Sequence, residues 1–134
     1  MSFRPKDFGK VAEEIYNALQ QSGTIPISNT VIEAWIRTAI SRAYYSAFLL
    51  INERSGKKFH GKRAHEDLVN YLKGKRGIYS IIGTKLDALR RNRIKADYWL
   101  PPKYTAILKN LHWTMLTLYD IFAKVKNAFL DFLA

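Results

Sequence analysis

Apolar residues recur three and four positions apart along almost the whole chain, and this period constrains the fold more than any other feature. Side chains at that spacing share one face of an α-helix, whereas a strand needs strict alternation, which is nearly absent here. The longest stripe consists of Ile32, Trp35, Ile36, Ala39, Ile40, Ala43, Ala47 and Ile51. Its three alanines stand four apart, so we expect another helix to approach closely at this stripe.

Glycines and prolines interrupt the helical pattern and mark the expected helix ends. A capping-box pattern from Thr30 to Glu33 opens the second helix, and a Pro-Pro pair shortly after Trp99 closes the fourth. We expect helices over 6–21, 30–54, 64–73, 78 (or 82)–95 and 103–132. Since no repeat or linker is visible, we predict a single domain over 1–134, an all-α antiparallel bundle of four to five helices.

The composition excludes several kinds of site. The chain has no cysteine, which excludes disulfides, thiolate catalysis and cysteine-ligated zinc. Its three histidines are not spaced with acids as metal ligands, so we expect neither a metal nor a cofactor. The start lacks the apolar core of a signal peptide, and no apolar run reaches the roughly 18 residues of a membrane span. We therefore expect a soluble, cytoplasmic protein that does not contact a membrane.

The charge balance indicates an anionic partner. The chain has 22 lysines and arginines against 11 acidic residues, a formal charge of +11. Such an excess favours phosphate-bearing partners through long-range attraction and counterion release. An acidic partner protein would satisfy the same charge, so the totals leave both kinds of partner open.

The segment RRNRIKADYW, residues 90–99, combines four cations with an acid and two aromatics. Arg93 continues the apolar line of the fourth helix, so its charge is directed toward a packed face or a subunit contact and needs a partner there. Asp97 stands one helical turn further on. We therefore expect Arg93 and Asp97 to form a structural ion pair.

The other cations of this segment point elsewhere. Arg91 and Lys95 are four apart and lie away from the apolar line, so we expect them to face solvent or phosphate. Arg90 and Lys95 also complement the negative end of the helix dipole, which would explain them without any ligand.

Two further stretches stand out. SRAYYSAF, residues 41–48, has mostly a core pattern, yet Arg42, Tyr44 and Tyr45 supply more hydrogen-bonding groups than packing requires. GKKFHGKRAH, residues 56–65, holds four cations around Phe59, a composition that suits single-stranded RNA with a base stacked on the ring. An exposed, mobile loop with no ligand would have the same composition.

Together these stretches resemble the HEPN superfamily, named for nucleotide binding in higher eukaryotes and prokaryotes. The resemblance consists of SRAYYSAF in a long second helix, His65 at the start of a short helix, and then RIKADY. Within RIKADY, the pattern Arg93, Ala96, Asp97 and Tyr98 is similar to that of small prokaryotic members. The order of elements is similar over nearly the whole chain.

The resemblance implies a bundle of four or five helices, commonly a homodimer whose motif lines a cleft between the subunits. Many members are metal-independent ribonucleases, and others accompany a small nucleotidyltransferase in toxin–antitoxin pairs. The toxin-branch signature is similar to this chain at Arg91, Asn92 and Tyr98, but Ala96 stands in the histidine position. Metal-free RNA cleavage needs a group of near-neutral pKa to move a proton, which alanine lacks.

We therefore expect a protein that binds nucleotide or RNA, lacks the full ribonuclease motif and forms a homodimer, with a nucleotidyltransferase-like partner protein. One alternative is an active ribonuclease or toxin with Arg91, Asp97 and His65 as catalytic candidates. Another is a helical scaffold for an acidic partner protein. The expected nucleotide- or RNA-binding residues are Arg42, Tyr45, Arg90, Arg91, Asn92, Lys95 and Tyr98.

Overall fold

The computed structural model describes residues 4–21, 29–99 and 104–128. The helices are α1 (Pro5–Gln21), α2 (Asn29–Ser55), α3 (Ala64–Gly74), α4 (Ile78–Ile94) and α5 (Tyr104–Ala128), and α4 continues into a π-helical turn, η1 (Lys95–Trp99). The described residues contain no strand. The predicted all-α bundle is therefore confirmed.

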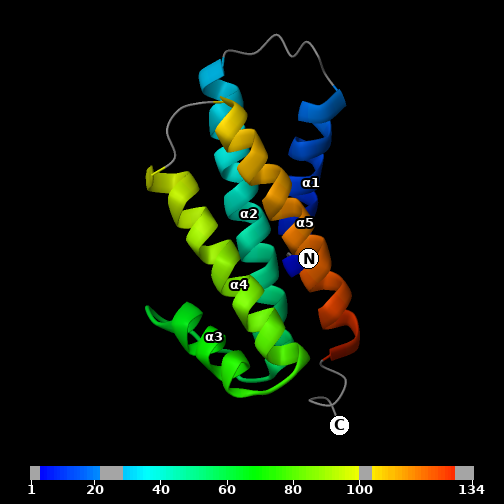
Figure 1. Cartoon of the computed structure of the whole chain (residues 1–134), viewed down its shortest axis with the longest axis vertical. Coiled ribbons are helices and arrows are strands. Elements are labelled where there is room, and N and C mark those ends of the chain that lie inside the picture. The colour runs from blue at the N-terminus through cyan, green and yellow to red at the C-terminus, as the bar shows by residue number, and fades with distance from the viewer. Residues whose placement is uncertain (1–3, 22–28, 100–103, 129–134) are drawn as a thin grey trace.

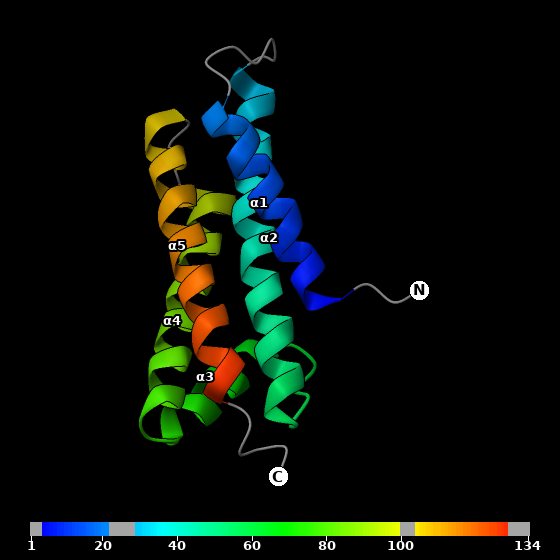
Figure 2. The ribbon, with the colours of Figure 1, turned by 90° about the vertical axis from the view of Figure 1, so that its right-hand side faces the viewer.

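The four long helices run alternately up and down (Figure 1). The short α3 lies at one end, where the chain passes from α2 to α4. The view in Figure 2, turned by 90°, has α1 beside α2, and α5 in front of α4. Among the described helices, none is long and apolar enough to cross a membrane.

The core lies between the long helices, and α2 supplies much of it. Most of the predicted stripe is buried, with Ile36, Ala39 and Ile40 fully excluded from solvent. Trp35 is the exception and the prediction for it was wrong, because its side chain is 38% exposed. Its stripe neighbours Ile32 and Ile36 are buried, so Trp35 lies at the side of the buried face and not within it.

Two glycines allow the close helix contacts. A Cβ atom added at Gly9 of α1 would stand 2.9 Å from Ser46 Oγ of α2, and one at Gly83 of α4 would stand 2.9 Å from Leu72 Cβ of α3. Real Cβ atoms almost never approach so closely. Glycine has only a hydrogen atom in place of a Cβ atom. It therefore lets α1 approach α2 at Gly9, and α3 approach α4 at Gly83.

The helix boundaries agree closely with those expected, apart from the end of α4. That helix was expected to end at about residue 95, and the chain instead keeps helical hydrogen bonding through η1. The capping role of the Thr30 side chain, the Pro-Pro pair and the predicted last turn over 129–132 lie outside the described residues.

Candidate functional site

The predicted site residues of α4 and η1 lie on two sides of the helix. Arg91, Asn92 and Lys95 lie toward α5 and solvent. Arg93 lies toward α2, where its guanidinium is 5.1 Å from the ring centre of Tyr45. Burial, and after it the charge of the half-buried Arg90, lowers the pKa of His65 in α3. The residues expected to act together are therefore divided between two locations.

The first location is a shallow hollow of about 270 Å³ between α4 and α5, called here the α4–α5 hollow. Its described lining consists of Ala88, Arg91, Asn92, Lys95 and Trp113. Lys95 is exposed, and the side chain of Arg91 is 66% exposed. Trp113, from α5, is 44% exposed and adds an aromatic surface beside the two cations.

Asn92 joins the two helices that form the hollow. Its side-chain amide donates to Asn110 Oδ1 and, over 2.6 Å, to the buried Thr114 Oγ1. Asn110 Nδ2 donates in return to Asn92 Oδ1 over 2.6 Å. Because these bonds occupy its amide, Asn92 fixes the floor of the hollow and leaves ligand contacts to its neighbours.

Arg91 is paired only at the surface. Its guanidinium lies 3.2 Å from the Asp87 carboxylate, which also lies 3.7 Å from Lys73 Nζ of α3. Exposed pairs of this kind contribute about 0.2–1 kcal/mol and are screened by salt. Arg91 can therefore turn toward a phosphate at little cost.

On the opposite side, the predicted pair is present. Arg93 Nε lies 3.4 Å from Asp97 Oδ2, and the guanidinium lies 5.1 Å and 5.9 Å from the ring centres of Tyr45 and Tyr44. Only 23% of the Arg93 side chain is exposed. The carboxylate and the two aromatic faces together stabilise a largely buried cation.

Arg42 is part of the same aromatic group. Its guanidinium lies 5.4 Å from the ring centres of both Phe8 and Tyr45. Its buried Nε makes no hydrogen bond within the described part of the chain. Arg42 and Tyr45, both expected to bind a ligand, therefore connect α1 and α2 to Arg93 and lie away from the α4–α5 hollow.

His65 lies close to α4, but its side chain is already engaged in contacts with α2. Its Nδ1 is hydrogen-bonded to the Tyr44 hydroxyl, and its ring lies 4.2 Å from that of Phe48. Burial lowers the pKa of His65, and the charges of Arg90 and Arg93 lower it further. Burial also raises the pKa of Tyr44 well above its ordinary value. The pair is therefore a neutral hydrogen bond at physiological pH.

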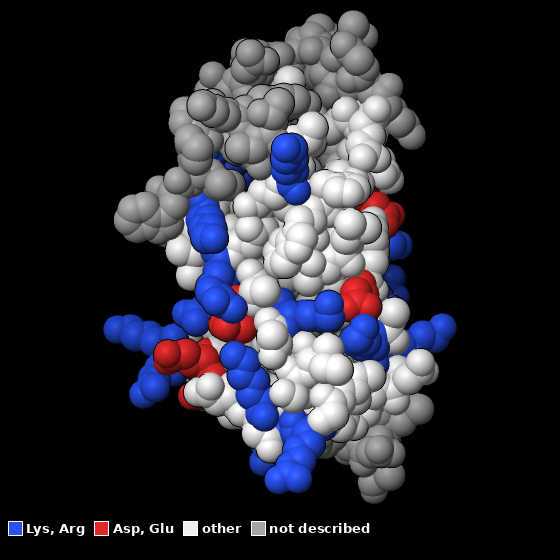
Figure 3. All heavy atoms as spheres, viewed as in Figure 1, with Lys and Arg blue, Asp and Glu red and all other residues white. Residues whose placement is uncertain are grey.

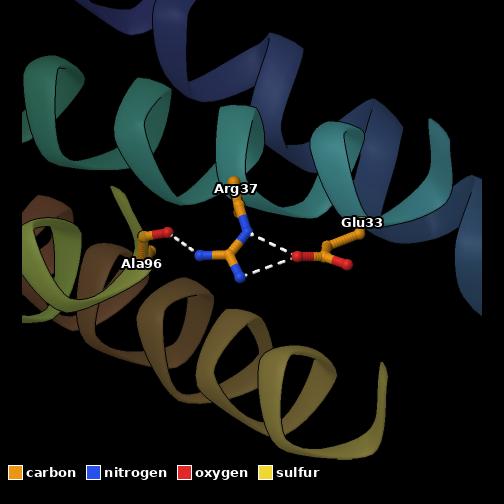
Figure 4. Close-up of polar contacts among 3 residues, drawn as sticks. All are labelled: Glu33, Arg37 and Ala96. Atoms are coloured by element: carbon orange, nitrogen blue, oxygen red, sulfur yellow. Dashed lines mark hydrogen bonds and ion pairs between the residues drawn. The ribbon is translucent and has the colours of Figure 1, made fainter. Parts of the chain in front are cut away.

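Ala96, at the position of the missing histidine, faces inward. Its side chain is fully buried, and its carbonyl accepts a hydrogen bond from Arg37 of α2 (Figure 4). Glu33 Oε1 holds the same guanidinium, at 2.7 Å and 3.0 Å from two of its nitrogens. An arginine on α2 therefore fixes η1 through its backbone. The side chain of Tyr98, the last predicted binding residue, lies outside the described residues.

Sequence reasoning missed Trp113 and the Asn110–Thr114 partners of Asn92. The apolar character of α5 suggested that other helices or a second subunit would cover it. The signal for an outward face was the spacing of Lys109, Trp113 and Leu116, which recur four and three positions apart.

No family model matches this chain, and neither a curated protein nor a solved structure matches it. Among the described residues, no group of three histidine, cysteine or acidic side chains is placed to hold a metal ion. The resemblance to the HEPN superfamily stays a prediction.

Proposed function

We propose that this chain is a HEPN-like protein that binds RNA or a nucleotide at the α4–α5 hollow. The observation that carries the proposal is the combination of two exposed cations, Arg91 and Lys95, with the exposed indole of Trp113. Cations neutralise phosphates and an aromatic face stacks on a base, which is how proteins bind single-stranded RNA. The net charge of +11 adds long-range attraction.

Binding without cleavage is the activity that this hollow supports best. Its described lining contains no histidine or acid. Charge stabilisation without proton transfer leaves metal-free RNA cleavage slow. An acidic partner protein would use the cations but would gain nothing specific from a stacking surface, so it explains fewer of these features.

The partners in this proposal are a second copy of the chain and a nucleotidyltransferase-like protein. Both come from the family resemblance, and the exposed side chains of Leu116 and Ile81 on α5 and α4 support a further protein contact. A dimer formed there would bring two hollows near each other.

The chain provides a matched pair of tryptophans for the test. Trp113→Ala should weaken binding of a short single-stranded RNA by about 1–3 kcal/mol, or about 5- to 150-fold. Trp35→Ala removes an indole of similar exposure from α2 and should leave the affinity unchanged. Fluorescence anisotropy of a labelled RNA measures both. Equal affinities for the two variants would contradict the proposal.

A cleavage assay separates binding from ribonuclease activity. Mixed RNA incubated without metal should stay intact in the presence of the wild-type chain. Clean cutting that disappears in a folded Arg91→Ala variant would establish the ribonuclease alternative instead.

A further inference from the structure

Residues 57–76, called here the basic end, carry a large share of the net charge. They comprise the segment before α3, α3 itself and the start of the turn after it, and contain seven lysines and arginines against two acidic residues. Figure 3 shows cations gathered around the end of the bundle where α3 lies, and further cations along the edge formed by α4. No function assigned above uses this surface.

The backbone that carries these cations is held in place. Asn52 of α2 binds Phe59 twice, since its amide donates to the Phe59 carbonyl over 2.8 Å and its Oδ1 accepts from the Phe59 N–H over 2.9 Å. Ser55 Oγ also accepts from the Lys57 N–H over 3.3 Å. The segment is therefore tied to α2 at Lys57 and Phe59, while the side chains of Lys58, Lys62 and Arg63 stay exposed.

Phe59 has a structural role in this segment. It is partly buried against the core, with its ring centre 5.9 Å from that of Tyr71 in an edge-on contact. Tyr71 in turn lies 5.5 Å from Lys57 Nζ and 5.1 Å from Lys75 Nζ. One cation from the segment before α3 and one from just after it therefore each contact the same ring.

Several cations of the basic end have no acidic partner. Lys58, Lys62 and Arg76 make no ion pair within the described residues, and all three are exposed. Arg63 pairs with Glu66 in an exposed contact of 3.2 Å. Like charges placed together repel one another, so the binding of an anion to such a surface is favourable.

The basic end is connected to the α4–α5 hollow through one carboxylate. Asp87 contacts Lys73 of α3 on one side and Arg91 of α4 on the other. The two cations are therefore close neighbours, and both are paired with the Asp87 carboxylate. From Ala64 to Lys73, α3 alone is about 14 Å long at 1.5 Å per residue, and cations also precede and follow it, so the joined surface is longer than a mononucleotide.

We propose that the basic end binds the phosphate backbone of the same RNA whose base stacks at the hollow, so that the ligand is a polynucleotide and not a mononucleotide. This rests on the proposed function. The hollow supplies the single stacking contact, and the basic end supplies contacts that do not depend on base sequence. A longer RNA therefore reaches both.

A phospholipid surface fits the basic end less well. Peripheral membrane binding combines cations with apolar side chains that enter the lipid interface. None of the exposed large apolar side chains of the described chain lies within residues 57–76. A polynucleotide needs only the charges.

The test compares two lengths of RNA and two double variants. Single-stranded oligonucleotides of about 4 and about 16 nucleotides span the range of typical sites. Lys58→Gln/Lys62→Gln removes two cations of the basic end without touching Tyr71. Lys58 has a positive φ of 52°, and glutamine tolerates it no worse than lysine. Lys6→Gln/Lys10→Gln removes equal charge from exposed positions on α1. Circular dichroism confirms the fold of each variant.

The longer RNA should bind the wild-type chain at least about tenfold more tightly than the shorter one. The basic-end variant should lose most of that advantage, and the slope of log K against log salt should become shallower by about 1.4 for two lost phosphate contacts. The α1 variant should keep both the affinity advantage of the longer RNA and the salt slope of the wild-type chain. Binding of the shorter RNA should be unaffected by the basic-end variant and still depend on Trp113.

Each other outcome is decisive. If binding of the shorter RNA depends on Trp113 but both double variants bind the longer RNA equally well, the proposed function of the hollow is retained and the inference about the basic end fails. If neither RNA binds, the proposed function and the inference both fail. If phosphatidylserine vesicles bind as tightly as the longer RNA, and Lys58→Gln/Lys62→Gln releases them, the basic end is a lipid surface and the inference is overturned.

Discussion

At the scale of single residues, the surroundings of each side chain separate roles that the sequence places side by side. Arg91 and Arg93 are two positions apart, yet one is exposed beside Trp113 and the other is enclosed by Asp97 and two tyrosines. Two residues along a helix turn a side chain by more than half a revolution. Neighbouring cations of one motif therefore perform different tasks.

The first residue-scale prediction concerns Ala96. Replacing this fully buried methyl group by histidine should force α2 and η1 apart and destabilise the fold by about 1–3 kcal/mol, without creating metal-free RNA cleavage. Urea unfolding and an RNA cleavage assay measure the two effects. Lys95→His, at the exposed neighbouring position, should cost much less. A stable Ala96→His variant that cuts RNA would show that this position faces a ligand.

The second concerns pH and His65. Burial, with Arg90 and Arg93, lowers its pKa in the folded chain from the ordinary 6.5. Below about pH 6.5 the unfolded chain therefore binds more protons than the folded chain, so stability should fall as the pH drops below that value. Above it, His65 should contribute no pH dependence.

Urea unfolding between about pH 5 and pH 8 measures this dependence. His65→Gln should flatten the acid side of the profile relative to wild type. His60→Gln, at an exposed histidine, should leave the profile unchanged. Parallel profiles for the wild-type chain and His65→Gln would contradict the prediction.

At the scale of elements, one cross-helix contact determines how α4 ends. Arg37 donates to the Ala96 carbonyl, and Glu33 fixes the guanidinium from within α2. A π-helical turn opens the regular bonding of a helix, so an outside donor to its carbonyl stabilises it. Asp97 then stands within reach of Arg93.

Arg37→Met tests this role. The variant should lose about 1–3 kcal/mol, because a carbonyl that had a charged donor loses it. Amide hydrogen exchange over Lys95–Trp99 should become faster, as measured by mass spectrometry. Arg54→Met removes an exposed arginine near the other end of α2 and should change neither quantity. Unchanged exchange in the Arg37 variant would mean that η1 is held by other contacts.

At the scale of the whole molecule, charged and apolar surfaces occupy different parts of the bundle. The basic end surrounds α3, while the apolar side chains of Leu116 and Ile81 are exposed on α5 and α4. Nucleic acid and a second protein could therefore be bound at the same time. We place the proposed dimer at Leu116 and Ile81, which lie outside the basic end.

Sedimentation at micromolar concentration tests that arrangement. The wild-type chain should sediment as a dimer, and Leu116→Glu should shift it to a monomer by placing a charge in the contact. Leu116 is 56% exposed, so the monomer should keep its helical content. Val31→Glu, at a side chain on α2 that is 41% exposed, should remain dimeric. A monomeric wild-type chain would contradict the proposed dimer that brings two hollows near each other.

The sequence by itself determined the helices, most of the core and the Arg93–Asp97 pair. These features depend on spacing along one helix, and the period of 3.6 residues converts such spacing directly into a shared face. The same reasoning placed Trp35 in the core, because periodicity gives the direction of a side chain but not whether another helix covers it.

Only the tertiary structure decided which helices face one another, and so which residues form the site. Trp113 lies beside Arg91 and Lys95. Asn110 and Thr114 form hydrogen bonds with Asn92, and Tyr44 forms one with His65. Each contact links residues that are 18 or more positions apart, where local periodicity carries no information. Packing of the buried faces fixes these distances, and the composition of the motif does not.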